Sequence, residues 1–154
     1  MKRTITLMLV FILTIPTLFA KESLKSIVRD FQRNNSEFVM VIPSFLIKMG
    51  LAFGEMEDEE REVLEMIDDM KIVICENRFD KADWQALDAG IKDGTFTELM
   101  TVNDKDEKVR MVMNKKSENK TEMLMIVESN DENVLMLFNF YGEPDMKKFM
   151  SLAD

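Results

Sequence analysis

The stretch from Phe96 to Phe149 decides the fold. It contains four apolar segments, FTELMTV (96–102), VRMVMN (109–114), EMLMIVE (122–128) and VLMLFNFY (134–141), followed by a short amphipathic segment. Alternating or continuous apolar runs of this length, bounded by polar turn residues, are typical of β-strands. The loops between them are rich in Asn, Asp and Ser and are too short for a crossover helix. The stretch therefore predicts an antiparallel four-strand meander, Phe96–Val102, Val109–Asn114, Glu122–Glu128 and Val134–Tyr141, and then a helix.

The third and fourth strands are apolar on both faces. Met123–Val127 and Val134–Phe138 are unbroken runs of Met, Leu, Ile, Val and Phe, whereas the second strand alternates, with Arg110 between Val109 and Met111. A strand that is apolar on both faces usually lies inside a sheet that is covered twice. The second cover could be helices or another copy of the same sheet.

The chain upstream of the meander predicts helices and two further strands. Leu24, Ile27, Val28 and Phe31 repeat at the spacing of one helix face, which predicts a helix over Glu22–Asn34. The next elements are strand Phe38–Ile42, helix Ser44–Phe53, strand Lys71–Glu76 and helix Asp80–Ile91. Before strand Lys71–Glu76, the acidic stretch Glu55–Glu62 forms the solvated start of a helix that continues through Val63, Leu64, Ile67 and Met70. We expect Ser44–Phe53 to be largely buried.

Helix Asp80–Ile91 has Asp80 as its expected N-cap, and Trp84, Leu87 and Ile91 line one side of it. The final helix begins at Pro144, and its apolar face consists of Met146, Phe149, Met150 and Leu152. We find no internal repeat, low-complexity linker or break in composition. The sequence therefore predicts one α+β domain over residues 21–154, a mainly antiparallel sheet with helices packed on it.

Residues 1–20 have the pattern of a secretory signal peptide. Lys2 and Arg3 precede an apolar run from Ile5 to Phe19, and Ala20 is suited to the position before the cleavage site. The alternative is an uncleaved anchor helix, which needs about 20 apolar residues, and this run is shorter and contains Pro16. We therefore predict an exported protein, periplasmic or secreted, without stable membrane insertion after cleavage.

The charge and the rare residue types exclude several functions. The chain has 20 basic and 29 acidic residues, so removal of Lys2 and Arg3 leaves 18 against 29, a net charge of −11. This excess disfavours nucleic acid and anionic membrane surfaces as partners. The single cysteine, Cys75, cannot form an internal disulfide and is expected to be buried. The absence of histidine excludes Ser–His–Asp and Cys–His catalysis and imidazole metal sites.

The chain after residue 20 resembles a known family. The pattern includes Phe38-Val39-Met40-Val41 with the helix after it, strand Ile72-Val73-Ile74, the meander, and the turn Gly142-Glu143-Pro144-Asp145, in which the proline is a local variation. These segments resemble the domain of unknown function 4252 family of small exported proteins of Bacteroidota-type bacteria. The resemblance carries over no catalytic residue and implies no established activity. Members are often encoded near extracytoplasmic-function sigma factors, which implies a link to envelope signalling.

Methionine is unusually frequent, with 15 residues, of which 13 follow the predicted signal peptide. Met111 and Met113 share one face of their strand, and Met123 and Met125 share a face of the next. If the strand register aligns them, four thioethers converge, and soft thioether ligands suit Cu(I). The alternative is that methionine fills an irregular core. We favour the core, because Val and Ile occupy equivalent positions in the same strands.

Carboxylates in two loops offer a further candidate site. Asp104 and Asp106 alternate in one loop, and Asp131 and Glu132 lie in another, which suggests either a pair for hydrolysis or a calcium site. Acidic loop residues are more often simply solvated, and Asp104/Asp106 lacks the further ligands and glycine of an EF-hand loop. We therefore assign no catalytic, cofactor-binding or metal-binding residue.

The sequence leads to a non-enzymatic binding or interaction protein of the bacterial cell envelope. Its partner would be an unidentified protein or a second copy of the chain. The alternatives are a small-ligand or Cu(I) carrier that uses the methionine-rich sheet, and a carboxylate hydrolase. An uncovered apolar sheet face would favour assembly, an enclosed cavity would favour a ligand, and a cleft with inward carboxylates would favour hydrolysis.

Overall fold

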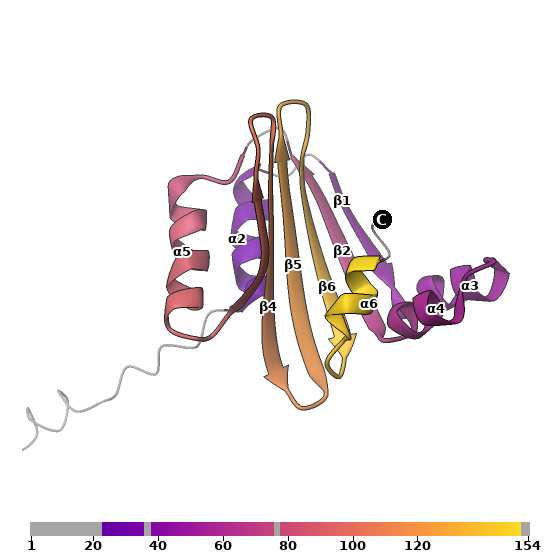
Figure 1. Ribbon diagram of the computed structural model, residues 1–154. Helices are drawn as coiled ribbons and strands as arrows, with labels where there is room; N and C mark the ends of the chain where they lie inside the picture. Colours follow the sequence, from indigo (N-terminus) through magenta and orange to yellow (C-terminus); the bar gives the residue numbers. More distant parts are fainter. Residues whose placement is uncertain (1–22, 36–37, 76–77, 152–154) are drawn as a thin grey trace, which may run out of the picture.

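The computed structural model describes residues 23–35, 38–75 and 78–151, which form an α+β fold around an antiparallel sheet (Figure 1). Within these residues the sheet has six strands in the order β1-β2-β6-β5-β4-β3. The strands are β1 (Phe38–Pro43), β2 (Ile67–Cys75), β3 (Thr97–Asn103), β4 (Glu107–Ser117), β5 (Lys120–Ser129) and β6 (Asn133–Tyr141). The helices are α2 (Leu24–Asn35), α3 (Ser44–Phe53), α4 (Asp58–Glu65), α5 (Lys81–Lys92) and α6 (Met146–Ser151).

The predicted meander is confirmed. Strands β3 to β6 follow one another in sequence and in the sheet, and every neighbouring pair is antiparallel. The strands extend beyond the predicted bounds, because the ladder between β4 and β5 includes polar residues from Glu107 to Ser117. Strands β5 and β6 lie inside the sheet, as their apolar faces predicted.

The predicted helix through Ile67 and Met70 is wrong at its end. Helix α4 stops at Glu65, and both residues belong to β2, where Ile67 pairs with Phe140 and Met70 with Phe138. The three-residue spacing of Ile67 and Met70 fits a helix face, and in β2 both side chains reach the same core only because a bulge between Ile67 and Asp69 shifts the register. The long ladder with β6 decides between helix and strand, and such a distant contact leaves no signal in the local pattern.

Helices α2 and α5 cover one face of the sheet, which we call the helix face (Figure 1). The stripe predicted for α2 is buried in this core; it comprises Leu24, Ile27, Val28 and Phe31. Helix α5 begins as predicted, because the Asp80 side chain accepts hydrogen bonds from the backbone N–H groups of Ala82 and Asp83. Leu87 of α5 is fully buried, and Phe79 joins the two helices by packing against Phe31.

The other face, which we call the open face, is only partly covered. Helix α6 packs on β6, where the Phe149 ring meets those of Phe138 and Phe140 edge-on at centroid distances of 5.4 and 5.8 Å. The helix begins at Met146, two residues later than predicted, because Asp145 accepts the backbone N–H of Lys147 and so caps it. The side chain of Met150 and the whole of Leu152 lie outside the described residues.

The predicted burial of helix Ser44–Phe53 is wrong. In α3 only Leu51 is buried among the side chains of the helix, and Phe45 and Phe53 are 64% and 86% exposed. A run of apolar residues indicates burial only when neighbouring elements surround it. Figure 1 shows α3 and α4 projecting from the β1 side of the sheet instead of lying across it.

The predicted signal peptide, residues 1–20, lies outside the described residues. None of the helices in the described part of the chain combines the length and the apolar character needed to cross a membrane.

Gly90 of α5 allows the helix to approach the start of β3 closely. A Cβ at this position would lie 2.2 Å from Cδ2 of Phe96, whose ring is buried in the core of the helix face. The backbone N–H of Phe96 also donates to the Gly90 carbonyl at 2.9 Å. Neither contact leaves room for a larger residue.

We predict that Gly90→Ala destabilises the fold by about 1–3 kcal/mol, because the methyl group must displace the Phe96 ring. Gly50→Ala is the matched control, since a Cβ there meets nothing within 4 Å. That change should stabilise α3 by about 0.5–1 kcal/mol through helix propensity. Urea unfolding followed by circular dichroism measures both, and equal free energies of unfolding for the two variants would contradict the prediction.

Candidate functional site

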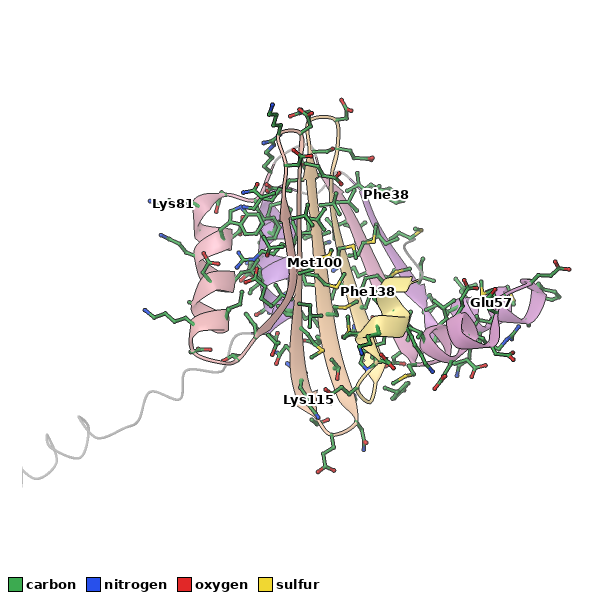
Figure 2. The ribbon with its side chains drawn as sticks, in the orientation of Figure 1. Phe38, Glu57, Lys81, Met100, Lys115 and Phe138 are labelled. Carbon is green, nitrogen blue, oxygen red and sulfur yellow. The ribbon has the colours of Figure 1, made fainter. Side chains whose placement is uncertain are left out.

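The strand register places apolar side chains in two continuous rows across the open face. The valine row consists of Val102, Val109, Val127, Val134, Ile74 and Phe38, in order from β3 to β1. The methionine row consists of Met100, Met111, Met125, Met136, Ile72 and Met40. Met100 belongs to edge strand β3 and Phe38 to the opposite edge strand β1, and Figure 2 labels both residues. Neither row contains a charged or polar side chain.

These rows are only partly shielded from solvent. Val102 and Phe38, at the two ends of the valine row, are 45% and 52% exposed, and the four residues between them are half-buried. In the methionine row only Met111 is fully buried. On the helix face the corresponding side chains of β4, β5 and β6, such as Val112, Leu124 and Leu135, are at most 1% exposed. Over β4, β5 and β6 the uncovered area thus belongs to the open face only.

The next row along the strands shows how far α6 extends. This row consists of Thr97, Met113, Met123, Phe138, Met70 and Ile42, in order from β3 to β1, and Met123 and Phe138 are buried beside the helix. Figure 2 shows Phe138 next to α6. The cover therefore ends between this row and the methionine row. Contiguous exposed apolar surface of this kind marks interaction sites in soluble proteins.

The four methionines singled out in the sequence do lie together. Met111 is paired with Met125, and Met113 with Met123, so all four occupy one face of two neighbouring strands. Met111 and Met123 are buried, and the other two are half-buried. All of them except Met113 belong to the core of the open face together with Phe138 and Phe140. The arrangement fits a packed core and also meets the register condition for a thioether site.

The carboxylates singled out in the sequence lie in two turns at the same end of the sheet. Asp104 and Asp106 are in the β3–β4 turn, and Asp106 accepts a hydrogen bond from Asn130 of the β5–β6 turn at 3.2 Å. A pocket of about 230 Å³ at the β3–β4 turn is lined by Asp104 and Asp106 together with the cationic side chains of Arg78, Lys105 and Lys108, and Asp131 and Glu132 are not part of its lining. Within the described residues, no group of three or more Asp, Glu, Cys or His side chains is placed to hold a metal ion. Cys75 is buried, as expected.

A polar pocket at the opposite end of the strands was not anticipated from the sequence. It has a volume of about 250 Å³ and is lined by Lys25, Lys116, Lys120, Asp68, Asp69, Thr121, Glu122, Asn139 and Phe140. Glu122 is buried, and its Oε2 lies 3.8 Å from the Lys116 ammonium nitrogen. Asp69 accepts a hydrogen bond from Asn139 at 2.6 Å. Asp69 thus has a hydrogen-bond partner, whereas the buried Oε2 of Glu122 accepts no hydrogen bond within the described residues and has only the ion pair with Lys116.

The sequence contains one signal for Glu122, because this charged residue directly precedes the apolar run of the third strand. Its side chain points to the helix face, opposite Asn114 of β4, which is also buried. A buried carboxylate needs a compensating charge, and Lys116 supplies it here. Glu122 and Asn114 become neighbours only through the β4–β5 register, which the sequence does not reveal.

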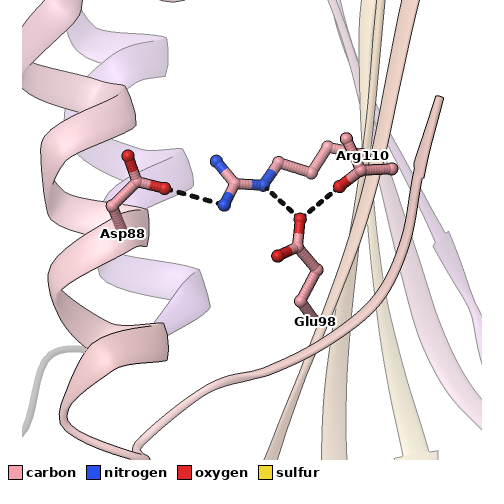
Figure 3. Close-up of polar contacts among 4 residues, drawn as sticks. Asp88, Glu98 and Arg110 are labelled. Carbon is pink, nitrogen blue, oxygen red and sulfur yellow. Dashed lines mark hydrogen bonds and ion pairs between the residues drawn. The ribbon is translucent and has the colours of Figure 1, made fainter. Parts of the chain in front are cut away.

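An ion-pair network connects α5 with strands β4 and β3 at the edge of the helix face (Figure 3). The Arg110 guanidinium bonds Asp88 of α5 at 2.7 Å and Glu98 of β3 at 2.9 Å. Glu98 also accepts a hydrogen bond from the Thr101 hydroxyl. Lys108 places its ammonium group 3.6 Å from the centre of the Trp84 ring, a cation–π contact. This edge of the sheet is thereby tied to α5.

The protein has an α+β fold. Helices α2 and α5 cover one face of its sheet, and the two apolar rows lie on the other face, which is only partly covered. The family model described as a domain of unknown function (DUF4252) matches residues 31–152. The chain belongs to this family, which confirms the resemblance seen in the sequence. No curated protein and no solved structure matches the chain.

The network at Glu98 predicts a pH dependence of stability. The hydrogen bond from Thr101 and the neighbouring Arg110 hold the pKa of Glu98 below its ordinary value, although partial burial acts in the opposite direction. A carboxyl with a lowered folded-state pKa stabilises the fold above its ordinary pKa of about 4.3. That stabilisation is lost as the pH falls through the folded-state pKa.

We therefore expect Glu98→Gln to be less stable than the wild type at neutral pH, with a difference that shrinks below about pH 4. Urea unfolding of both proteins across this pH range measures the difference in free energy. Thr101→Val should reduce the same pH dependence without removing the Arg110 ion pair. A difference between wild type and Glu98→Gln that is constant with pH would contradict this assignment.

Proposed function

We propose that this chain is an exported, non-enzymatic interaction protein of the bacterial cell envelope. Its binding surface is the part of the valine and methionine rows that runs over β3 to β6. One observation supports this proposal above all: these rows form a continuous apolar surface without charge and without a helix over it. Burial of such surface against a partner is the main source of free energy in protein association.

The shape of the surface favours a protein over a small ligand. Small ligands bind in concave pockets that surround most of their surface, whereas the rows lie across a sheet. The two polar pockets described above lie at the ends of the strands, and no residue of either row lines them. Interface cores are depleted in charged residues and enriched in methionine, and both rows have this composition. Methionine also adapts its shape to different partners.

The charge of the chain indicates which partner fits. An excess of acidic over basic residues, with a net charge of −9 over the whole sequence, attracts a partner that carries basic residues around an apolar patch. The export of the protein is supported by the pattern of residues 1–20. The link to envelope signalling through extracytoplasmic-function sigma factors is part of the same proposal and rests only on what the resemblance of the sequence to the family implies.

The decisive experiment compares two lysine substitutions on β3. Val102 ends the valine row and is 45% exposed, so Val102→Lys places a charge on the rows without disturbing the core. Thr97→Lys places the same side chain on the same strand, at an exposed position outside both rows. We predict that Val102→Lys loses the protein complex isolated from the envelope fraction and that Thr97→Lys retains it.

Native mass spectrometry of the three proteins, purified from their own envelope fractions, provides the measurement. The wild type should have the mass of residues 21–154 plus that of a protein partner. A non-protein mass that survives gentle ionisation and leaves on denaturation would overturn the proposal in favour of a carrier. Complexes of equal abundance in both variants would show that the rows are not the binding surface.

A second candidate function is supported by the β4–β5 register, which brings Met111, Met113, Met123 and Met125 onto one face. This function is transport or storage of Cu(I), held by thioether sulfurs. It predicts that Cu(I), added under reducing conditions, raises the melting temperature of the wild type. Met113→Leu with Met125→Leu should abolish the rise, because leucine keeps the volume and removes the ligand. Equal melting temperatures with and without Cu(I) would exclude this function.

A further inference from the structure

The exposed large apolar side chains of the described residues are concentrated in one segment. Ten such side chains are exposed, and eight of them lie between Phe38 and Met56, in β1, in α3 or in the residues just after it. They are Phe38, Met40, Val41, Phe45, Leu46, Met49, Phe53 and Met56. The other two, Val102 and Tyr141, are isolated from this group in the sequence. We call residues 38–56 the β1–α3 segment.

Strand β1 has the sequence of a central strand but lies at an edge of the sheet. All six of its residues are apolar, FVMVIP, and side chains on both of its faces are exposed: Phe38 and Met40 on the open face and Val41 on the helix face. It pairs with β2 on one side, and no strand of the described residues pairs with the other side. A long apolar edge without charged residues is a site for pairing with another strand.

The opposite edge of the same sheet provides an internal comparison. Strand β3 contains Thr97, Glu98, Thr101 and Asn103 among its seven residues, and Glu98 is fixed by Arg110. Polar and charged side chains on an edge strand discourage pairing with another chain. One edge of this sheet therefore has the features that prevent association, and the other edge lacks them.

The charge distribution favours a second copy of the chain as the partner of β1. Two copies of an acidic protein repel each other, and a two-fold contact brings identical residues close together. Lys48 is the only charged residue from Phe38 to Gly54, so this patch avoids like-charge contacts in a self-complementary pair. An antiparallel pair of identical strands also satisfies the backbone groups of both in the same way.

Helix α3 adds a second apolar surface next to this edge. Phe45, Met49 and Phe53 follow at i, i+4 and i+8, so they form one exposed stripe, with Leu46 beside it. On the opposite side of the helix, Leu51 is buried, and Ile47 packs against the core of the open face. Because α3 projects outward from the β1 side of the sheet, its exposed stripe extends beyond the molecule's own strands (Figure 1).

We propose that two copies of this chain associate through the β1–α3 segment, with β1 of one copy antiparallel to β1 of the other. The two sheets become one continuous sheet, in which β1 has a neighbour on each side. The α3 stripe of each copy then lies over the β1 and β2 strands of its partner, on the open face near Phe38. The pairing ends at Pro43, which has no N–H to donate.

The exposed area is sufficient for a stable dimer. At their exposed fractions, the eight side chains present on the order of 800 Å² to solvent, since large side chains have about 150–250 Å² each. A standard interface buries about 800 Å² on each partner. This proposal deepens the interaction role proposed above by naming a second copy as one partner, and it uses β1 and α3 instead of the rows over β3 to β6.

Lysine substitutions at the two edges test the proposal. Val41 is 56% exposed and lies opposite Lys71 of β2 in its own chain, so Val41→Lys adds like charges in the monomer as well as in the paired state. Val41→Glu lies favourably opposite Lys71 in the monomer and brings like charges together only in the paired state, so it should separate the copies as Val41→Lys does. Thr97→Lys introduces the same charge at the β3 edge as a control. By analytical ultracentrifugation of the chain after residue 20, we expect the wild type and Thr97→Lys to have twice the chain mass and Val41→Lys to have the single mass.

Hydrogen exchange distinguishes edge pairing from other contacts. The amides of Phe38–Ile42 should be protected in the wild type and should lose protection on dilution, in Val41→Lys and in Val41→Glu, while the amides of β4 and β5 stay protected in all of them. A wild type that stays monomeric, a dimer that Val41→Lys leaves intact, or β1 amides that exchange equally in both proteins would each overturn the proposal. A monomeric wild type that still carries a protein partner from the envelope would overturn this inference and leave the proposed function standing.

Discussion

The register between β4, β5 and β6 is the constraint on which the rest of the structure depends. Successive residues of a strand point to opposite faces, so one register assigns every side chain of the sheet to a side. In β5 this register directs Leu124 and Ile126 to the helix face and Met125 and Val127 to the open face. A shift by one residue would expose the first pair and bury the second. The helix core and the two rows are therefore consequences of the same set of pairings.

The two faces differ because the helices that cover them differ. Helices α2 and α5 are each 12 residues long and pack on the helix face, where Phe31, Phe79 and Trp84 form a chain of aromatic contacts. On the open face, α6 has six residues, and α3 and α4 lie at the β1 side. A helix of six residues is about 9 Å long, so it cannot span a strand of nine or ten residues. The valine and methionine rows remain open for this reason.

Local sequence patterns predicted the elements well and their environment poorly. The four strands of the meander, the stripe of α2 and the Asp80 cap follow from spacing and residue type, and the structure has all of them. The end of α4 and the exposure of α3 did not follow, because each depends on elements distant in the sequence. The same holds for the site: the methionines were visible as a pattern, but their alignment and the absence of a covering helix depend on register and packing.

The choice of side chains on the open face itself argues for a surface that changes between free and bound states. The core of the helix face contains Leu, Ile, Val and Phe but no methionine, whereas seven of the residues that pack in or against the core of the open face are methionines between Met66 and Met136. Methionine has an unbranched, polarisable side chain and adopts many conformations at low cost. In a closed core methionine fills irregular gaps, as Met111 and Met123 do here, but its conformational freedom is lost on folding. On a face that meets a partner only after folding, it lets the same side chains fit both solvent and the partner, so the composition of the sheet agrees with the role proposed for it.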